Sequence, residues 1–353
     1  MVNQTFGRYV TITPTIRDGV KGNLVRIYNQ PVHTIGEKGI SELLQTMKRL
    51  EQDKESRYAI FYTGSAEAHA GANIKEFVGE ISPSWALKHT LEGAVAQAMA
   101  ENLPITTVGV LDEKKRYGGS VEWPLWFKYS IAAQTTTLHL PEVNIGLFPG
   151  WAGPSRIERK VTRTRGSSIG RRVAAQYCST GQPMSALEAY HYGILDLPPI
   201  PQPEIMEVAR NLAIHEEVDE LEVSLAEKYY NKKLAQEVNV EASLMNRDEI
   251  LSKMLQNPAV GPLAVKTIDD LVFQNYVGLM NKDEVLEFVG SVPEFGVDEV
   301  ETASKILYYS GIDEFENKAI HGAVECARLM LTEDRKEGAQ AFVEKRKPNF
   351  KGV

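Results

Sequence analysis

The most informative stretch of this chain for its architecture runs Thr135-Thr-Thr-Leu-His-Leu140, then Pro141-Glu-Val-Asn-Ile-Gly-Leu-Phe-Pro-Gly150 and Trp151-Ala-Gly153. Its β-branched and apolar first part predicts a β-strand, and the prolines and glycines behind it predict a loop at the strand end. Glu142 stands in that loop. A lone glutamate there is usually a solvated surface group, whereas two glutamates brought together in an apolar pocket would have pKa values raised toward neutral pH.

The sequence on the N-terminal side of this stretch alternates strand and helix patterns. Apolar residues recur at helical spacing from Glu37 to Leu50, and a second helical stretch runs from Leu87 to Ala100. Short β-branched and aromatic runs predict strands at Asn23–Tyr28, Tyr58–Thr63 and Ile105–Val110. Strands that alternate with helices in this way predict an α/β architecture with largely parallel strand pairing.

The chain changes character after Leu197. The segment Leu197-Pro-Pro-Ile-Pro-Gln-Pro203 carries four prolines, which exclude a regular helix or a central strand. Beyond this segment the sequence is helical and charged to its end. We therefore predict an α/β core over residues 1–197 and a helical region over residues 198–353.

The composition is that of a globular protein with an acidic balance. The 353 residues include 39 Lys+Arg and 47 Asp+Glu, a formal net charge of -8. We expect no nucleic-acid partner, because phosphate binding needs a basic surface. Cys178 and Cys326 lie in no CxxC or Cys/His pattern, so both are predicted to be reduced core thiols, and no metal site is expected. The absence of a spanning apolar run or a signal-peptide pattern predicts a soluble, cytoplasmic protein with no membrane partner.

Two glycine-containing segments could present free backbone N–H groups to a ligand. His69-Ala-Gly-Ala-Asn-Ile-Lys-Glu-Phe77 follows the second predicted strand, and a helix is predicted to begin near Asn73. Tyr117-Gly-Gly-Ser-Val-Glu-Trp123 predicts a short helix that Ser120 caps, with Gly119 at its positive end, an arrangement that suits a developing oxyanion. Taken alone, each segment fits an ordinary capped turn better.

Taken together and in this order, these segments resemble the enoyl-CoA hydratase (crotonase) superfamily. The elements that carry the resemblance are Leu24-Val-Arg-Ile-Tyr-Asn-Gln-Pro31, Phe61-Tyr-Thr-Gly-Ser65 with Ala70-Gly-Ala-Asn-Ile-Lys-Glu-Phe77, Pro141–Gly150, Thr180-Gly-Gln-Pro-Met-Ser-Ala186 with Gly193-Ile-Leu-Asp196, and Thr332-Glu-Asp-Arg-Lys-Glu-Gly338 with Ala341-Phe-Val-Glu-Lys-Arg-Lys347. The resemblance implies a spiral of ββα units followed by helices used for trimerisation, and so a homo-oligomer, either a trimer or a dimer of trimers. The helical region is longer than usual, which implies an insertion at about 205–300 before C-terminal helices at 301–353.

The resemblance also implies an activity and its residues. Family members bind acyl-CoA thioesters, and two backbone N–H groups, here those of Ala72 and Gly119, hold the thioester oxygen as an enolate forms. The two glutamates of the hydratases map onto Glu122 and Glu142, and this pair favours an enoyl-CoA hydratase-like lyase that hydrates or dehydrates a 2-enoyl-CoA. No cofactor is implied beyond CoA as part of the substrate. The residues implied for substrate and CoA binding are Ala70, Gly71, Asn73, Ile74, Lys75, Gly118 and Trp151, with Phe342 and Lys345 reaching in from a neighbouring subunit.

Three departures from the family pattern bear on the reaction. Leu111–Ser120 is longer and more highly charged than the family's glycine-rich run, which reshapes the loop that carries Gly119. The bulky Trp123, Trp126 and Trp151 indicate an unusual acyl pocket, shaped for a cyclic or aromatic-derived acid, although packing explains them equally well. Longer family members include ring-opening CoA hydrolases, so hydrolysis of a ring C–C bond or a thioester stays an alternative, as do enoyl-CoA isomerisation and a non-catalytic scaffold.

Overall fold

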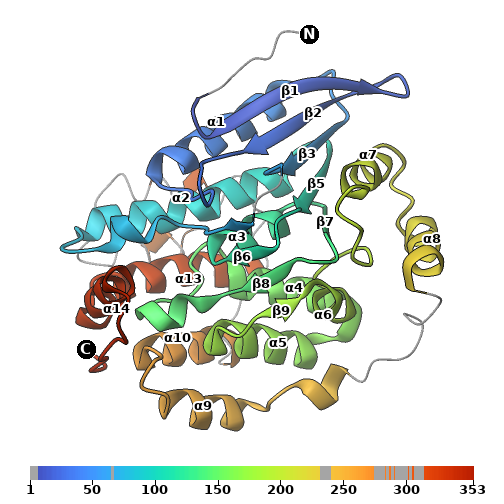
Figure 1. The fold of residues 1–353 in the computed structure, drawn as a ribbon. Coiled ribbons are helices and arrows are strands. Elements are labelled where there is room, and N and C mark those ends of the chain that lie inside the picture. Colours follow the sequence, from blue (N-terminus) through green and yellow to red (C-terminus); the bar gives the residue numbers. More distant parts are fainter. Residues whose placement is uncertain are drawn as a thin grey trace.

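The computed structural model describes residues 7–64, 67–230, 240–273 and 314–353, together with single positions between 283 and 305. Two β-sheets form the centre of the described chain, and helices from both halves of the sequence pack around them (Figure 1). The C-terminal helices α13 (Glu314–Leu329) and α14 (Glu333–Glu344) return to the core that the N-terminal half builds. The predicted α/β architecture is confirmed.

The larger sheet consists, in spatial order, of β1 (Val10–Arg17), β2 (Val20–Ile27), β3 (Tyr58–Tyr62), β5 (Thr106–Leu111) and β7 (Tyr129–Ala132). β1 pairs antiparallel with β2, and the other pairs are parallel. The structure confirms the strands predicted at β2, β3 and β5. The two edge strands, β1 and β7, were not predicted, and Pro14 of β1 fits the edge position that this strand occupies.

The smaller sheet consists, in spatial order, of β4 (Ala68–His69), β6 (Lys115–Tyr117), β8 (Thr137–His139) and β9 (Met184–Ser185). β8 is shorter than the strand predicted at Thr135–Leu140, because Thr136 lies in a turn where its N–H donates to the carbonyl of Ala133 at 3.0 Å. β8 leads directly into the 3₁₀ helix η3 (Pro141–Ile145), which contains Glu142.

Two long helices pack beside the larger sheet on the N-terminal side of the chain. α1 (Glu37–Gln52) buries Ile40, Leu43 and Met47, which confirms the helical spacing in the sequence. α2 (Pro83–Glu101) begins at Ser82, whose hydroxyl accepts a hydrogen bond from the Trp85 N–H at 3.2 Å. α2 is buried on nearly all sides, because it packs against both α1 and α13.

Shorter helices complete the described chain. α4 (Gly153–Arg165) and α5 (Ser167–Thr180) pack against each other and against α10 (Pro262–Phe273), so that part of the helical region covers the core. The remaining helices are η1 (Ile74–Phe77), α3 (Gly119–Glu122), η2 (Trp123–Trp126), α6 (Ala186–Tyr192), α8 (Val218–Tyr230), η5 (Val240–Ser243) and α9 (Arg247–Leu255). No helix in the described ranges is long and apolar enough to cross a membrane.

The first helix after the proline-rich segment, α7 (Ile205–His215), packs on the larger sheet. Its Val208 and Leu212 join a buried cluster with Ile60 and Val108 of that sheet. The helical region therefore begins in direct contact with the α/β core. The division at residue 197 and the insertion at about 205–300 stay predictions, since residues 231–239 and most of 274–313 lie outside the described residues.

Candidate active site

A cavity of about 300 Å³ lies where the segments after β4, β6 and β8 meet α2, α13 and α14, and its wall is mainly apolar. These segments belong to distant parts of the chain, and the parallel pairing of β4, β6 and β8 brings their ends together. Of the residues predicted for the site, the cavity is lined by Ala70, Ala72, Ile74, Gly118, Gly119, Glu122, Glu142, Trp151 and Phe342. Gly71, Asn73, Lys75 and Lys345 are not among its lining residues.

Glu122 occupies the last position of α3 and is buried. Its Oε1 accepts hydrogen bonds from the N–H groups of Trp151 and Gly153, each at 2.8 Å, at the start of α4. Burial raises the pKa of Glu122 to about 8, although these two hydrogen bonds lower it. A side chain at Gly153 would place its Cβ 2.9 Å from the same oxygen, so glycine is needed there.

Glu142 faces the same cavity from η3. Its Oε2 is buried and has no hydrogen-bond partner among the described residues. Burial and the charge of Glu122 both hold the pKa of Glu142 well above its ordinary value. Two carboxyl groups in one apolar cavity therefore favour a state in which protons are retained near neutral pH, and such groups can donate and accept protons in catalysis.

The two predicted oxyanion donors lie on segments in close contact. Gly71 has a positive φ of 69°, and a Cβ at this position would lie 2.8 Å from the Gly119 nitrogen. The segment of Ala72 thus runs against the start of α3, where the N–H of Gly119, as the first residue of the helix, has no partner within the helix itself. The predicted cap was wrong: Gly118, not Ser120, is the N-cap of α3.

The Ser120 hydroxyl holds the two segments together instead of capping the helix. It accepts from the Tyr117 N–H and donates to the carbonyl of His69, each at 2.8 Å. A helix that starts at Gly119 leaves Ser120 inside its first turn, where the side chain turns toward β4 rather than toward the helix end.

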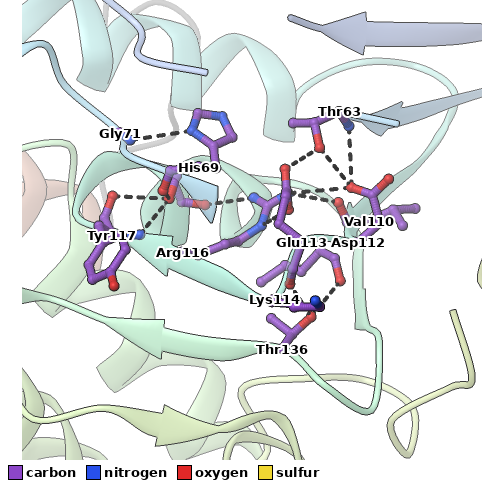
Figure 2. Close-up of polar contacts among 12 residues, drawn as sticks. Thr63, His69, Gly71, Val110, Asp112, Glu113, Lys114, Arg116, Tyr117 and Thr136 are labelled. Atoms are coloured by element: carbon purple, nitrogen blue, oxygen red, sulfur yellow. Dashed lines mark hydrogen bonds and ion pairs between the residues drawn. The ribbon is translucent and has the colours of Figure 1, made fainter. Parts of the chain in front are cut away.

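The charged segment between β5 and α3, which includes β6, contains a buried network (Figure 2). The Arg116 guanidinium donates through Nε to Glu113 at 2.6 Å and through Nη1 to the carbonyl of Ser120 at 2.7 Å. Thr63 donates to Asp112 at 2.8 Å and also contacts Glu113. This segment therefore supports α3 from behind the cavity, and Asp112, Glu113 and Arg116 are all buried. That it departs from the family's loop structure stays a prediction.

The family model described as enoyl-CoA hydratase/isomerase matches residues 23–257, well over half of the chain. The chain belongs to this family. It is similar to a probable enoyl-CoA hydratase of Bacillus subtilis strain 168, with 24% identity over 329 residues that cover 93% of this chain and 95% of the relative.

Solved structures with the crotonase fold cover nearly the whole chain. Methylmalonyl-CoA decarboxylase in complex with 2-nitronate-propionyl-CoA has 20% identity and a TM-score of 0.55, and covers 98% of this chain and 99% of its own. A carnitinyl-CoA dehydratase from Mycobacterium thermoresistibile has 16% identity and a TM-score of 0.57, and covers 96% of this chain and 91% of its own. At these identities the likeness shows the fold and not the reaction.

Only one of the three tryptophans highlighted in the sequence lines the cavity of this crotonase fold. Trp151 does so, and its ring fills the space beside Gly93 and Gly119, where a Cβ would clash with it. Trp123 and Trp126 lie in the hydrophobic core and do not line the cavity. The Trp126 Nε1 supports Trp151 by donating to its carbonyl at 3.2 Å. Of the two explanations that the sequence left open, core packing therefore holds for Trp123 and Trp126, and Trp151 is placed at the cavity.

The C-terminal helix α14 closes the cavity from within the same chain. Phe342 lines the cavity and is 58% exposed, while Lys345 follows at the C-cap of α14. Arg335 attaches α14 to the end of η1 and the residues after it, because its buried guanidinium donates to the carbonyls of Phe77 and Gly79, each at 2.7 Å. The reach of Phe342 and Lys345 into a neighbour's site stays a prediction.

Sequence reasoning missed several cavity residues. They come from α2, from the end of α13 and from the segment after α14, and they are His89, Thr90, Cys326, Met330 and Arg346. The spacing of His89 and Gly93 on one face of α2 could have suggested that this face meets a neighbour. Cys178 and Cys326 are both buried free thiols, as predicted. Burial raises the pKa of each.

Proposed function

We propose that this member of the family adds water to, or removes it from, the double bond of a 2-enoyl-CoA. The observation that carries the proposal is the meeting of Glu122 and Glu142, with raised pKa values, at one apolar cavity beside the Gly119 amide. Hydration needs a base for the water, an acid for the α-carbon and donors for the enolate oxygen. These groups supply all three functions.

In the proposed reaction the N–H groups of Ala72 and Gly119 bind the thioester oxygen. One glutamate, as carboxylate, takes a proton from water while the water oxygen bonds to the β-carbon. The electrons of the double bond pass toward the thioester oxygen, whose developing charge the two donors stabilise without reorganising. The other glutamate, in its neutral form, then donates its proton to the α-carbon. Dehydration follows the same steps in reverse.

Replacing Glu142 tests this proposal. We expect Glu142→Gln to abolish turnover of an enoyl-CoA and to leave acyl-CoA binding nearly unchanged, because the amide keeps the shape of the side chain and cannot take up a proton. Steady-state kinetics and calorimetric binding are the measurements. Glu67→Gln is the matched control, since the Glu67 side chain is 82% exposed. Turnover by Glu142→Gln at the wild-type rate would refute the assignment.

The alternatives are a hydrolase that cleaves a ring C–C bond or a thioester, and an enoyl-CoA isomerase. The aromatic wall formed by Trp151 suits a ring-bearing acyl group and keeps the hydrolase as the second candidate. Purified protein should be offered linear, branched, cyclic and aromatic-derived acyl-CoAs, with the mass of every product measured by mass spectrometry and its bonds assigned by NMR. A gain of one water without bond cleavage supports hydration. Ring opening or free CoA supports hydrolysis, and an unchanged mass with a shifted double bond supports isomerisation.

We further propose that the enzyme acts in the cytoplasm without a cofactor beyond the CoA of its substrate, without a metal, and without a nucleic-acid or membrane partner. Its two carboxyl groups and backbone donors suffice for proton transfer and charge stabilisation. We also propose a trimer or a dimer of trimers. Phe342 and Val343 of α14, 58% and 45% exposed, offer apolar surface for a neighbouring subunit. Sedimentation analysis measures the assembly.

A further inference from the structure

His89 is a polar group in the cavity that the proposed chemistry does not use. It projects from α2, is 3% exposed and lines the cavity next to Thr90. Its Nδ1 is buried and has no hydrogen-bond partner among the residues that the structure describes. A buried polar atom without a partner destabilises the protein, so such an atom on a side chain that lines a cavity points to a ligand that pairs with it.

Three aromatic rings fix the orientation of the His89 imidazole. Trp85 stacks on it with ring centroids 5.0 Å apart and an interplanar angle of 13°. Phe77 meets it edge-on at 5.4 Å, and Trp151 lies at 5.7 Å in a tilted arrangement. The imidazole therefore cannot swing away to find another partner, and its position relative to Trp151 in the wall of the cavity is set.

The imidazole is neutral at physiological pH. Burial lowers the pKa of His89 to about 4, and the weaker opposing effect comes from Glu37. A neutral imidazole has one N–H donor and one acceptor nitrogen. It is therefore matched to a hydroxyl or carbonyl oxygen rather than to a free ion.

Two other polar side chains at this wall, those of Thr90 and Glu122, already have hydrogen-bond partners. Thr90 donates within its own helix, to the carbonyls of Ala86 and Leu87 at 3.2 and 3.1 Å. Glu122 accepts from the backbone at the start of α4. His89 is thus a polar group in an otherwise mainly apolar wall, which gives it the means to select among acyl groups.

We propose that His89 hydrogen-bonds an oxygen atom of the acyl group, so that the substrate is an acyl-CoA with a hydroxyl or carbonyl oxygen beyond the reacting carbons. This inference rests on the proposed function, since it assumes that the acyl chain occupies the cavity. A site built to hydrogen-bond a substrate group discriminates strongly against the analogue that lacks the group, because the polar partner is then left unpaired.

Binding of saturated acyl-CoAs tests the inference without relying on turnover, since these probes have no double bond to hydrate. The probes are hexanoyl-CoA, 4-oxohexanoyl-CoA, 5-oxohexanoyl-CoA and 6-hydroxyhexanoyl-CoA, each titrated calorimetrically into the purified full chain. We expect at least one oxygenated probe to bind wild-type protein tenfold or more tighter than hexanoyl-CoA.

Variants of the wall separate hydrogen bonding from packing. We expect His89→Phe, which keeps an aromatic ring, to lose the preference and to bind hexanoyl-CoA as well as wild type does. His89→Gln, which keeps a donor and an acceptor, should retain part of the preference. Thr90→Val is the matched control and should retain all of it, because the Thr90 hydroxyl is bonded within α2.

The outcomes distinguish this inference from the proposed function. Equal binding of all four probes by wild-type protein, or an unchanged preference in His89→Phe, would overturn the role of His89 and leave the hydratase proposal standing. Failure of wild-type protein to bind any of the four would overturn both. If His89→Phe does not fold, the comparison of His89→Gln with Thr90→Val still decides: an equal preference in the two variants and wild type contradicts the inference.

Discussion

Single residues in this protein show how burial outweighs local hydrogen bonding. Glu122 accepts two backbone hydrogen bonds at a helix start, a position that ordinarily favours a carboxylate, yet its pKa is raised to about 8 because it is buried. Burial also raises the pKa of Glu142, and the charge of Glu122 raises it further. Burial raises the pKa values of both carboxyl groups toward the range that suits proton transfer. The same burial lowers the free energy of unfolding when either group ionises.

This cost predicts how stability depends on pH. Because the pKa of Glu122 is higher in the folded than in the unfolded chain, the folded state holds the proton more tightly. The stabilisation is fully present below the unfolded pKa, near 4.3, and is lost as the pH rises through about 8, at up to about 1.4 kcal/mol per pH unit. We expect Glu122→Gln to flatten this decline and to be more stable than wild type at about pH 8.

Urea denaturation at several pH values between about 5 and about 8 measures how steeply the free energy of unfolding falls with pH. Glu67→Gln, at an exposed position, should keep the wild-type slope. An identical slope in Glu122→Gln and wild type would show that burial of this carboxyl group does not govern the dependence. Glu142 should leave a residual slope in Glu122→Gln, since its pKa is raised as well.

At the scale of elements, the charged segment between β5 and α3, which includes β6, places its charged side chains Asp112, Glu113 and Arg116 inside the protein. Arg116 is fully buried, pairs with Glu113 and holds the Ser120 carbonyl of α3. Its guanidinium also lies over the ring of Trp123, 5.0 Å from the ring centroid. The helix start that presents Gly119 to the cavity is thus supported by a buried ion pair rather than by glycines alone (Figure 2).

Removing Arg116 should therefore affect both stability and activity. We expect Arg116→Met to lower the free energy of unfolding by about 3–5 kcal/mol, because it leaves the Glu113 carboxylate buried without its main partner. It should also reduce turnover more than acyl-CoA binding, since the proposed oxyanion donor Gly119 loses its support. Chemical denaturation and kinetics measure the two effects.

The neighbouring Lys115 offers a matched control for Arg116. Lys115 is exposed, and we expect Lys115→Met to change the free energy of unfolding by no more than about 0.5 kcal/mol. Adding Glu113→Gln to Arg116→Met should recover part of the stability, because it removes the unpaired charge. Equal stability of Arg116→Met and Lys115→Met would contradict a structural role for the buried pair.

At the scale of the whole molecule, the C-terminal helices complete a cavity that the N-terminal half begins. α13 packs against α2 and α4, and α14 against η1 and η3. A buried ion pair joins α13 to α4: Lys318 Nζ lies 2.8 Å from Glu158 Oε1. Arg171 approaches the same carboxylate at 3.5 Å. The cavity therefore depends on contacts between residues that lie far apart in sequence.

The ion pair predicts a coupling between the two halves of the chain. We expect Lys318→Met to destabilise the protein by about 3 kcal/mol, because Glu158 stays buried with a weakened set of partners. The double variant Lys318→Met with Glu158→Leu should be destabilised by much less than the sum of the two single variants. Thermal denaturation of the four proteins completes the cycle, and strict additivity would show that the pair does not couple the halves.

The sequence by itself determined the family, the α/β architecture and the strands β2, β3, β5 and β8. Hydrophobic periodicity is a local property, and so are the glycine and proline signals that bound β2, β3, β5 and α1. The positions of Glu122 and Glu142 followed from the resemblance in the same way. The local pattern was less reliable at the edge of the larger sheet, where β1 was missed. It was also less reliable at the start of α3, where Ser120 was wrongly taken as the cap.

Only the tertiary structure decided what surrounds those glutamates. His89 of α2 and Cys326 of α13 line the same cavity. Arg116 and Glu113 are buried, and Trp123 and Trp126 lie in the core. The physical reason is that burial and pairing depend on which distant segments pack together. A charged or aromatic residue looks the same in sequence whether it faces water, a partner or a substrate.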